Sequence, residues 1–146
     1  MKMEERGFTL LETIIVLSLV TLILGLTTVF FAGFLPSVRL QATGREIAAT
    51  IRQARYLSRM NMETRTVIID LGKRSFGIEG RSARDIPPGT AIRIIDPQAG
   101  EIRQGEYSIV LRPAGNMTGA TILLSVGRKA VRVEMDPVTG AVLTRD

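Results

Sequence analysis

The stretch Gly7-Phe8-Thr9-Leu10-Leu11-Glu12, with the apolar run that follows it, decides how this chain is organised. From Phe8 to Leu35 the sequence contains a single charged residue, Glu12. About 20 helical residues at ~1.5 Å each cross the hydrocarbon core of a bilayer, so residues 8–35 are predicted to form a transmembrane helix. A lone carboxylate in such a segment costs ~2.5–3.5 kcal/mol on insertion scales, which indicates that Glu12 has a function.

A short charged leader, residues 1–7, precedes the apolar run. Because no small-x-small cleavage pattern follows that run, the segment does not read as an ordinary secretory signal peptide. Lys2 and Arg6 favour a cytoplasmic N-terminus with the bulk of the chain on the other side of the membrane.

The apolar run is followed by a second helical pattern over residues 36–62. Pro36 lacks a backbone N–H, so we expect it to kink or interrupt the helix at the membrane exit. Beyond it the helix is amphipathic, with one apolar stripe predicted to face a core. That stripe consists of Leu40, Ile47, Ile51 and Ala54.

Most of the net charge of the chain lies on this second helix. A solvated face is the usual meaning of a charge run, and we expect these arginines on the side opposite the apolar stripe. Contact with acidic headgroups, with acidic neighbours in an assembly or with nucleic acid are the alternatives. The arginines concerned are Arg45, Arg52, Arg55 and Arg59.

Residues 63–146 read as a β-rich domain. Short β-branched runs alternate with Gly, Pro and Asp turns, which predicts about seven antiparallel strands that cover the apolar stripe. The expected fold class is therefore α+β: a long N-terminal helix, half transmembrane and half amphipathic, packed on an antiparallel sheet. The strands are expected at 66–70, 75–78, 90–95, 106–111, 121–126, 130–135 and 141–144, with 81–89 a loop and 96–100 a turn.

Composition excludes several classes of chemistry. The 146 residues carry a formal net charge of +5 and contain no Cys and no His. Disulfides, Cys/His metal sites and nucleophile–His arrangements are therefore excluded, and we expect no enzymatic activity, no metal and no cofactor. Asp136 and Thr139 offer oxygen ligands for a cation, but a simple turn is the favoured interpretation.

The segment Gly127-Arg128-Lys129 places a small basic patch, Arg128 and Lys129, at the expected end of a hairpin. A solvated hairpin end is the favoured interpretation, and binding to DNA is the alternative. The sequence has 5% aromatic residues and no Trp, which is little for a surface that stacks on bases.

The residues Gly7 to Glu12, with the apolar run, resemble the class III signal of type IV pilins and pseudopilins. The resemblance implies cleavage between Gly7 and Phe8 by a membrane prepilin peptidase, which also methylates the new N-terminus at Phe8. It implies that Glu12 is the charge partner used in assembly.

A second resemblance extends from the amphipathic helix to the end of the chain. The helix with Ile47, Ala54 and Arg55, the segment 111–115 (Leu-Arg-Pro-Ala-Gly) and the final Val-Thr-Gly-Ala-Val of 138–142 are similar to H-type minor pseudopilins of type II secretion and to FimT-like minor pilins.

This second resemblance implies a structural subunit of a pseudopilus that drives protein export across the outer membrane. The implied partners are other major and minor pseudopilins, the prepilin peptidase and an inner-membrane assembly platform. The implied location is the inner membrane, crossed once, with the N-terminus cytoplasmic and the β domain periplasmic. The alternative is a FimT-like minor type IV pilin that binds DNA or primes pilus assembly.

Overall fold

A computed structural model of the chain describes residues 8–115 and 117–145, with only the backbone described over 28–36. It divides into two compact units, residues 1–36 and residues 37–146, and each is considered by itself. The N-terminal methylation candidate Phe8 lies in the described part, whereas Gly7, on the other side of the expected cleavage site, lies outside it.

A single helix, α1 (Leu10–Asn61), crosses the boundary between these units. Of the two expectations at Pro36, an interruption is wrong, because the helical backbone continues through this residue. The kink, which is the favoured expectation, stays a prediction. The helix ends after Asn61, where Met62 adopts a left-handed φ of 54° and the amide of Glu63 donates to the Ser58 carbonyl at 3.2 Å. This is the bond of a Schellman cap, which satisfies a carbonyl that the helix leaves without a partner.

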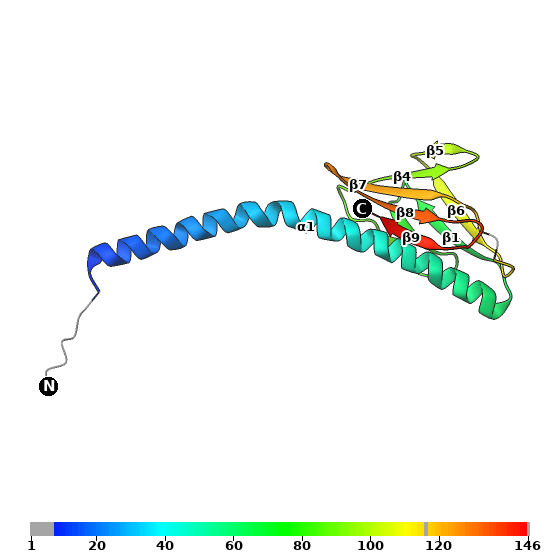
Figure 1. The fold of residues 1–146 in the computed structure, drawn as a ribbon, viewed down its shortest axis with the longest axis horizontal. Helices are drawn as coiled ribbons and strands as arrows, with labels where there is room; N and C mark the ends of the chain where they lie inside the picture. The colour runs from blue at the N-terminus through cyan, green and yellow to red at the C-terminus, as the bar shows by residue number, and fades with distance from the viewer. Residues whose placement is uncertain (1–7, 116, 146) are drawn as a thin grey trace, which may run out of the picture. The chain divides into compact units, whose positions relative to one another are not determined.

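Two antiparallel sheets follow the helix (Figure 1). The first has the strand order β3-β2-β1-β6 and the second the order β5-β4-β7-β8-β9. The first sheet comprises β1 (Arg65–Asp70), β2 (Ser75–Ile78), β3 (Arg84–Asp85) and β6 (Glu106–Leu111). The second comprises β4 (Ala91–Asp96), β5 (Gly100–Ile102), β7 (Thr121–Val126), β8 (Lys129–Met135) and β9 (Val142–Arg145).

The second half of α1 packs on both sheets through the apolar stripe that the sequence predicts. Leu40, Ile47, Ile51 and Ala54 are all buried, together with the inward-facing residues of the strands. At Gly44 the helix passes so close to β8 that an added Cβ would lie 2.7 Å from Cγ1 of Val131. The predicted stripe and the predicted antiparallel cover are therefore confirmed.

The strand predictions fail at two edges. Residues 81–89 contain β3, which pairs Ser75 with Asp85, and the turn expected at 96–100 leads into β5, which pairs Ile94 with Ile102. The residues that the structure describes thus form nine strands instead of about seven. Both missed strands are very short and mostly exposed, so they carry no alternation that a sequence pattern could reveal.

Candidate functional site

The N-terminal end of α1 is built around Thr9, which caps the helix. Its hydroxyl accepts a hydrogen bond from the Glu12 amide at 3.2 Å, and its carbonyl accepts one from the Thr13 amide at 3.2 Å. A threonine followed three positions later by a glutamate is the sequence pattern of a capping box. Our sequence analysis did not identify Thr9, although this pattern would have revealed it.

Glu12, the candidate assembly carboxylate, lies in the first turn of α1. A carboxylate is stabilised there by the positive end of the helix dipole. Glu12 is exposed and makes no ion pair with any residue in 8–115 or 117–145. The candidate methylation residue Phe8 lies four positions earlier, is 83% exposed and precedes the helix.

The first unit offers one candidate membrane span, Leu10–Thr27, with a mean hydropathy of 2.3 and none of it buried within the chain. Its threonines do not need an outside partner, because the hydroxyls of Thr21 and Thr27 donate to carbonyls four residues earlier, each at 2.7 Å. One face of this segment forms a shallow hollow lined by Ile14, Leu17, Ser18, Thr21, Leu22, Gly25 and Leu26. The segment therefore has apolar surface that no described residue of its own unit covers.

The arginines of the second half of α1 do not form one solvated face. Arg55 is half-buried and donates to the carbonyls of Gly140 and of Thr139, the latter at 2.9 Å. Arg52 donates to the Val142 carbonyl at 3.3 Å. The expectation that both point away from the domain is wrong: their guanidinium groups hold the backbone that leads into β9.

Gly140 explains why Arg55 can reach this backbone. Gly140 has a φ of 64°, and a Cβ placed on it would collide with the guanidinium group of Arg55. Our sequence analysis did not identify this contact, which joins residues 85 positions apart. The other two candidate arginines, Arg45 and Arg59, are exposed.

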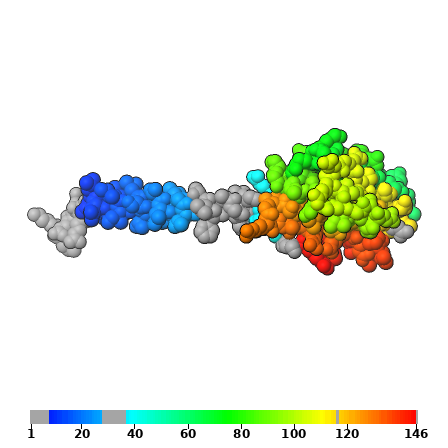
Figure 2. Space-filling view, turned by 90° about the horizontal axis from the view of Figure 1, so that it is seen from above, coloured from blue at the N-terminus to red at the C-terminus, as the bar shows by residue number. Residues whose placement is uncertain are grey.

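Arg128 and Lys129 lie, as expected, at the exposed tip of the hairpin formed by β7 and β8. Gly127 at this tip has a φ of 59°. The hairpin tip, drawn in orange, reaches the end of the β domain at which the cyan part of α1 enters (Figures 1 and 2). Lys129 there helps to line a hollow of about 380 Å³ together with Ser37, Leu40 and Gln41 of α1.

The candidate cation ligands Asp136 and Thr139 form a turn, as favoured. The Asp136 carboxylate accepts from the Thr139 hydroxyl at 2.8 Å and from the amides of Val138 and Thr139 at 2.8 and 3.2 Å. These hydrogen bonds, that from the Thr139 hydroxyl first, lower the pKa of Asp136. The carboxylate oxygens are thus engaged within the turn.

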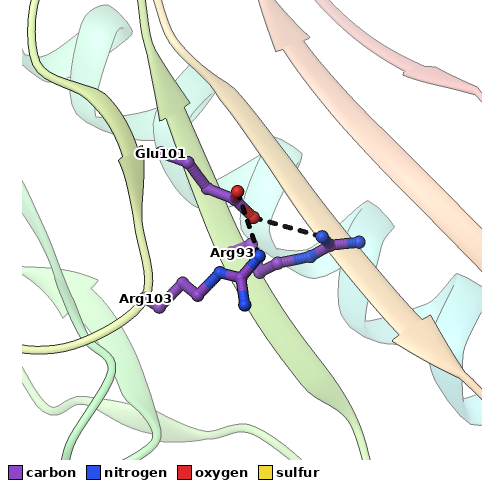
Figure 3. Close-up of polar contacts among 3 residues, drawn as sticks. All are labelled: Arg93, Glu101 and Arg103. Carbon is purple, nitrogen blue, oxygen red and sulfur yellow. Dashed lines mark hydrogen bonds and ion pairs between the residues drawn. The ribbon is translucent and has the colours of Figure 1, made fainter.

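The exposed face of the second sheet carries a different kind of charge cluster. Glu101 on β5 accepts from Arg93 on β4 and from Arg103, each at 3.1 Å (Figure 3). The hydrogen bond from Arg103 is the main reason why the pKa of Glu101 is lowered. Charges here are largely compensated within the protein itself.

Comparison with known proteins connects both units to one class. Residues 2–28 match the family described as the prokaryotic N-terminal methylation motif. The chain is 27% identical to the type II secretion system protein H of Xanthomonas campestris pv. campestris over 139 residues, which is 95% of this chain and 82% of that protein.

The fold is similar to the crystal structure of the type IV minor pilin FimU of Pseudomonas aeruginosa. The TM-score is 0.55 at 14% identity, over 77% of this chain and 92% of that one. The pilin-like fold expected from the sequence is therefore confirmed. Together, the methylation motif, the secretion-system relative and the fold support a role as a pseudopilin or minor pilin.

Proposed function

We propose that this chain is a minor pseudopilin of a type II secretion pseudopilus, a structural subunit and not an enzyme. The observation that carries the proposal is the combination of a match to the methylation motif with an apolar helix that has no cover within its unit. The secretion-system relative, which aligns over 95% of the chain, favours this role over a DNA-binding minor pilin.

The proposed maturation is cleavage between Gly7 and Phe8 by prepilin peptidase and methylation of the new amino group of Phe8. N-methylation leaves an amine basic, so the mature subunit begins with a positive charge at the membrane surface. Before assembly the subunit crosses the inner membrane once, with its β domain in the periplasm. Its partners are other pseudopilins and the inner-membrane assembly platform.

The proposed assembly contact joins Glu12 of one subunit to the Phe8 amine of a neighbour. A carboxylate and an ammonium group attract each other far more strongly in a low-dielectric environment than in water. An unpaired buried partner costs about 3–5 kcal/mol. The exposed carboxylate at the start of α1, with no ion pair among the residues described, is available for such a contact.

Glu12→Gln tests the assembly contact, because glutamine keeps the size of the side chain and its capping ability but removes the charge. We expect normal membrane insertion and a loss of incorporation into filaments of about a hundredfold or more. Thr21→Val is the matched control, since the Thr21 hydroxyl bonds only within its own helix. Pull-down of filaments with sister subunits measures the incorporation of each variant. Equal incorporation of Glu12→Gln and wild type would contradict the proposed assembly contact.

A further inference from the structure

Two segments at one end of the β domain carry positive charge without an ion pair to any described residue. Residues 37–45 of α1 and residues 127–132 of the β7–β8 hairpin contain five Lys and Arg and no Asp or Glu. The full chain has 19 Lys and Arg and 14 Asp and Glu, so these five cations equal its whole excess of positive charge. They are Arg39, Arg45, Arg128, Lys129 and Arg132.

Within the described residues, none of these five cations takes part in an ion pair. The acids that follow each segment are directed to other cations: Glu46 lies 3.8 Å from Arg84, and Glu134 lies 3.8 Å from Arg145. The β4–β5 hairpin behaves differently, because Arg93 and Arg103 each form an ion pair with Glu101 there (Figure 3). Five cations without an ion pair in the described part of the chain therefore lie in two short segments that contain no acidic residue.

The fold brings the two segments together. β8 runs alongside α1, with Val131 against Gly44 and Lys129 beside Ser37. The exposed cations nearest this end are Arg39 on the helix and Arg128 and Lys129 on the hairpin tip. We call this set the basic end.

The sequence then locates the basic end relative to a membrane. Ser37 follows directly on the apolar run of residues 8–35, separated from it by Pro36 alone. In a subunit that spans the bilayer, Ser37 lies within a few residues of the headgroups, and so do the side chains beside it, such as Lys129. Each Lys or Arg near an anionic lipid surface gains about 1 kcal/mol, equivalent to about fivefold in the ratio of docked to free states.

We propose that the basic end binds the headgroups of anionic phospholipids and so docks the β7–β8 hairpin tip on the membrane before the subunit is extracted. This proposal rests on the membrane-spanning subunit proposed above. It assigns to Arg39, Arg128 and Lys129 the role of a reversible, salt-sensitive contact. A docked tip would hold the β domain against the membrane until assembly pulls the helix out of the bilayer.

The absence of Cys from the sequence makes a direct test possible. Ala130→Cys places one fluorophore at an exposed position beside Lys129 in the full chain. The labelled protein is reconstituted in nanodiscs of phosphatidylcholine alone, or with about one quarter phosphatidylglycerol, each with a headgroup-attached spin label as quencher. We expect stronger quenching with phosphatidylglycerol, reversed by added salt.

The decisive variant is Arg128→Gln with Lys129→Gln, for which the docked-to-free ratio should fall about fivefold per cation removed. Arg81→Gln with Arg112→Gln is the matched control: it removes the same charge from exposed residues that make no ion pair with a described residue. This control should keep the wild-type quenching. Equal effects of the two double variants, or quenching that does not depend on lipid charge, would overturn the proposal.

Two further measurements separate the possible failures. Alkaline extraction of the same samples reports insertion: a chain that inserts without charge-dependent quenching disproves only the docking, whereas a chain that does not insert disproves the membrane anchor as well. The second measurement is the binding of a DNA duplex to the chain in phosphatidylcholine nanodiscs. Binding that disappears in the variant Arg128→Gln with Lys129→Gln would assign the basic end to nucleic acid and would also overturn the proposal.

Discussion

The two halves of α1 have similar apolar residues in opposite surroundings. Leu17 in the first half is 60% exposed, whereas Ile51 in the second half is completely buried. The second half packs on the two sheets of the same chain, whereas the first half has no such partner among the described residues of its own unit. One helix thus contains a surface for folding and a surface for an environment outside the chain, and hydrophobicity alone does not distinguish them.

The largest expected effect comes from deleting apolar atoms in each half. Ile51→Ala should destabilise the β domain by about 2–5 kcal/mol, because Ile51 is fully buried against the sheets. Ile15→Ala, at a half-exposed position of the first half, should leave the stability of the β domain unchanged. Urea unfolding of the full chain in detergent, followed by circular dichroism, measures both, and a loss of stability in Ile15→Ala would break the comparison.

Two glycines of the helix, Gly25 and Gly44, sharpen the comparison with a smaller effect. An added Cβ at Gly44 lies 2.7 Å from Val131, whereas one at Gly25 meets no atom within 4 Å. Overpacking costs about 1–3 kcal/mol and the gain in helix propensity returns about 1 kcal/mol, so Gly44→Ala should destabilise the β domain by up to about 2 kcal/mol. The melting temperature of the β domain in Gly25→Ala should match wild type, and an equal shift in both variants would be the contrary result.

The smallest expected effect is a dependence of stability on pH that arises from Asp96 in the second unit. Asp96 accepts from the Tyr107 hydroxyl at 2.5 Å and from the amides of Gln98 and Ala99, and these bonds, the tyrosine first, lower its pKa from 3.8. A lowered folded-state pKa gives stability that is present above the unfolded value and is lost as the pH falls through the folded value.

The melting temperature of the β domain should therefore decrease as the pH is lowered from about 6 to about 3. The melting temperature of Asp96→Asn should decrease less over the same interval. The helicity of the first half should not follow this change, because Asp96 and its hydrogen-bond partners all lie in the second unit. Identical pH profiles of the melting temperature for wild type and Asp96→Asn would show that Asp96 does not contribute to the pH dependence of stability.

Much of this architecture could be predicted from the sequence, because strong periodicity reports burial directly. The helical stripe of Leu40, Ile47 and Ile51 has the period of a helix with one buried face, and the strand at 121–126 has the alternation of a strand with one buried face. Both were predicted correctly. The division of the strands into two sheets could not be predicted, because it depends on pairing between distant segments such as β4 and β7.

The candidate site was predictable only where its signal is local. The turn at Asp136 was predicted from adjacent residues and is confirmed. The roles of Phe8 and Glu12 were also inferred from adjacent residues and stay predictions, whereas Gly7 lies outside the described residues. The roles of Arg52 and Arg55 were not predicted, since a charged residue on a helix reads as solvated until the backbone that it contacts is known. The basic end likewise appears only once β8 is placed alongside the helix.

The attachment of β9 has a consequence for how the subunit is made. Arg52 contacts Val142, which is 90 positions later in the chain. At a synthesis rate of ~5–20 residues per second, the helix waits roughly 5–20 s for the segment that completes its cover. Throughout that interval the apolar stripe of the second half of α1 lacks part of its cover, so slower synthesis should lengthen the time for which a newly made chain is prone to aggregate.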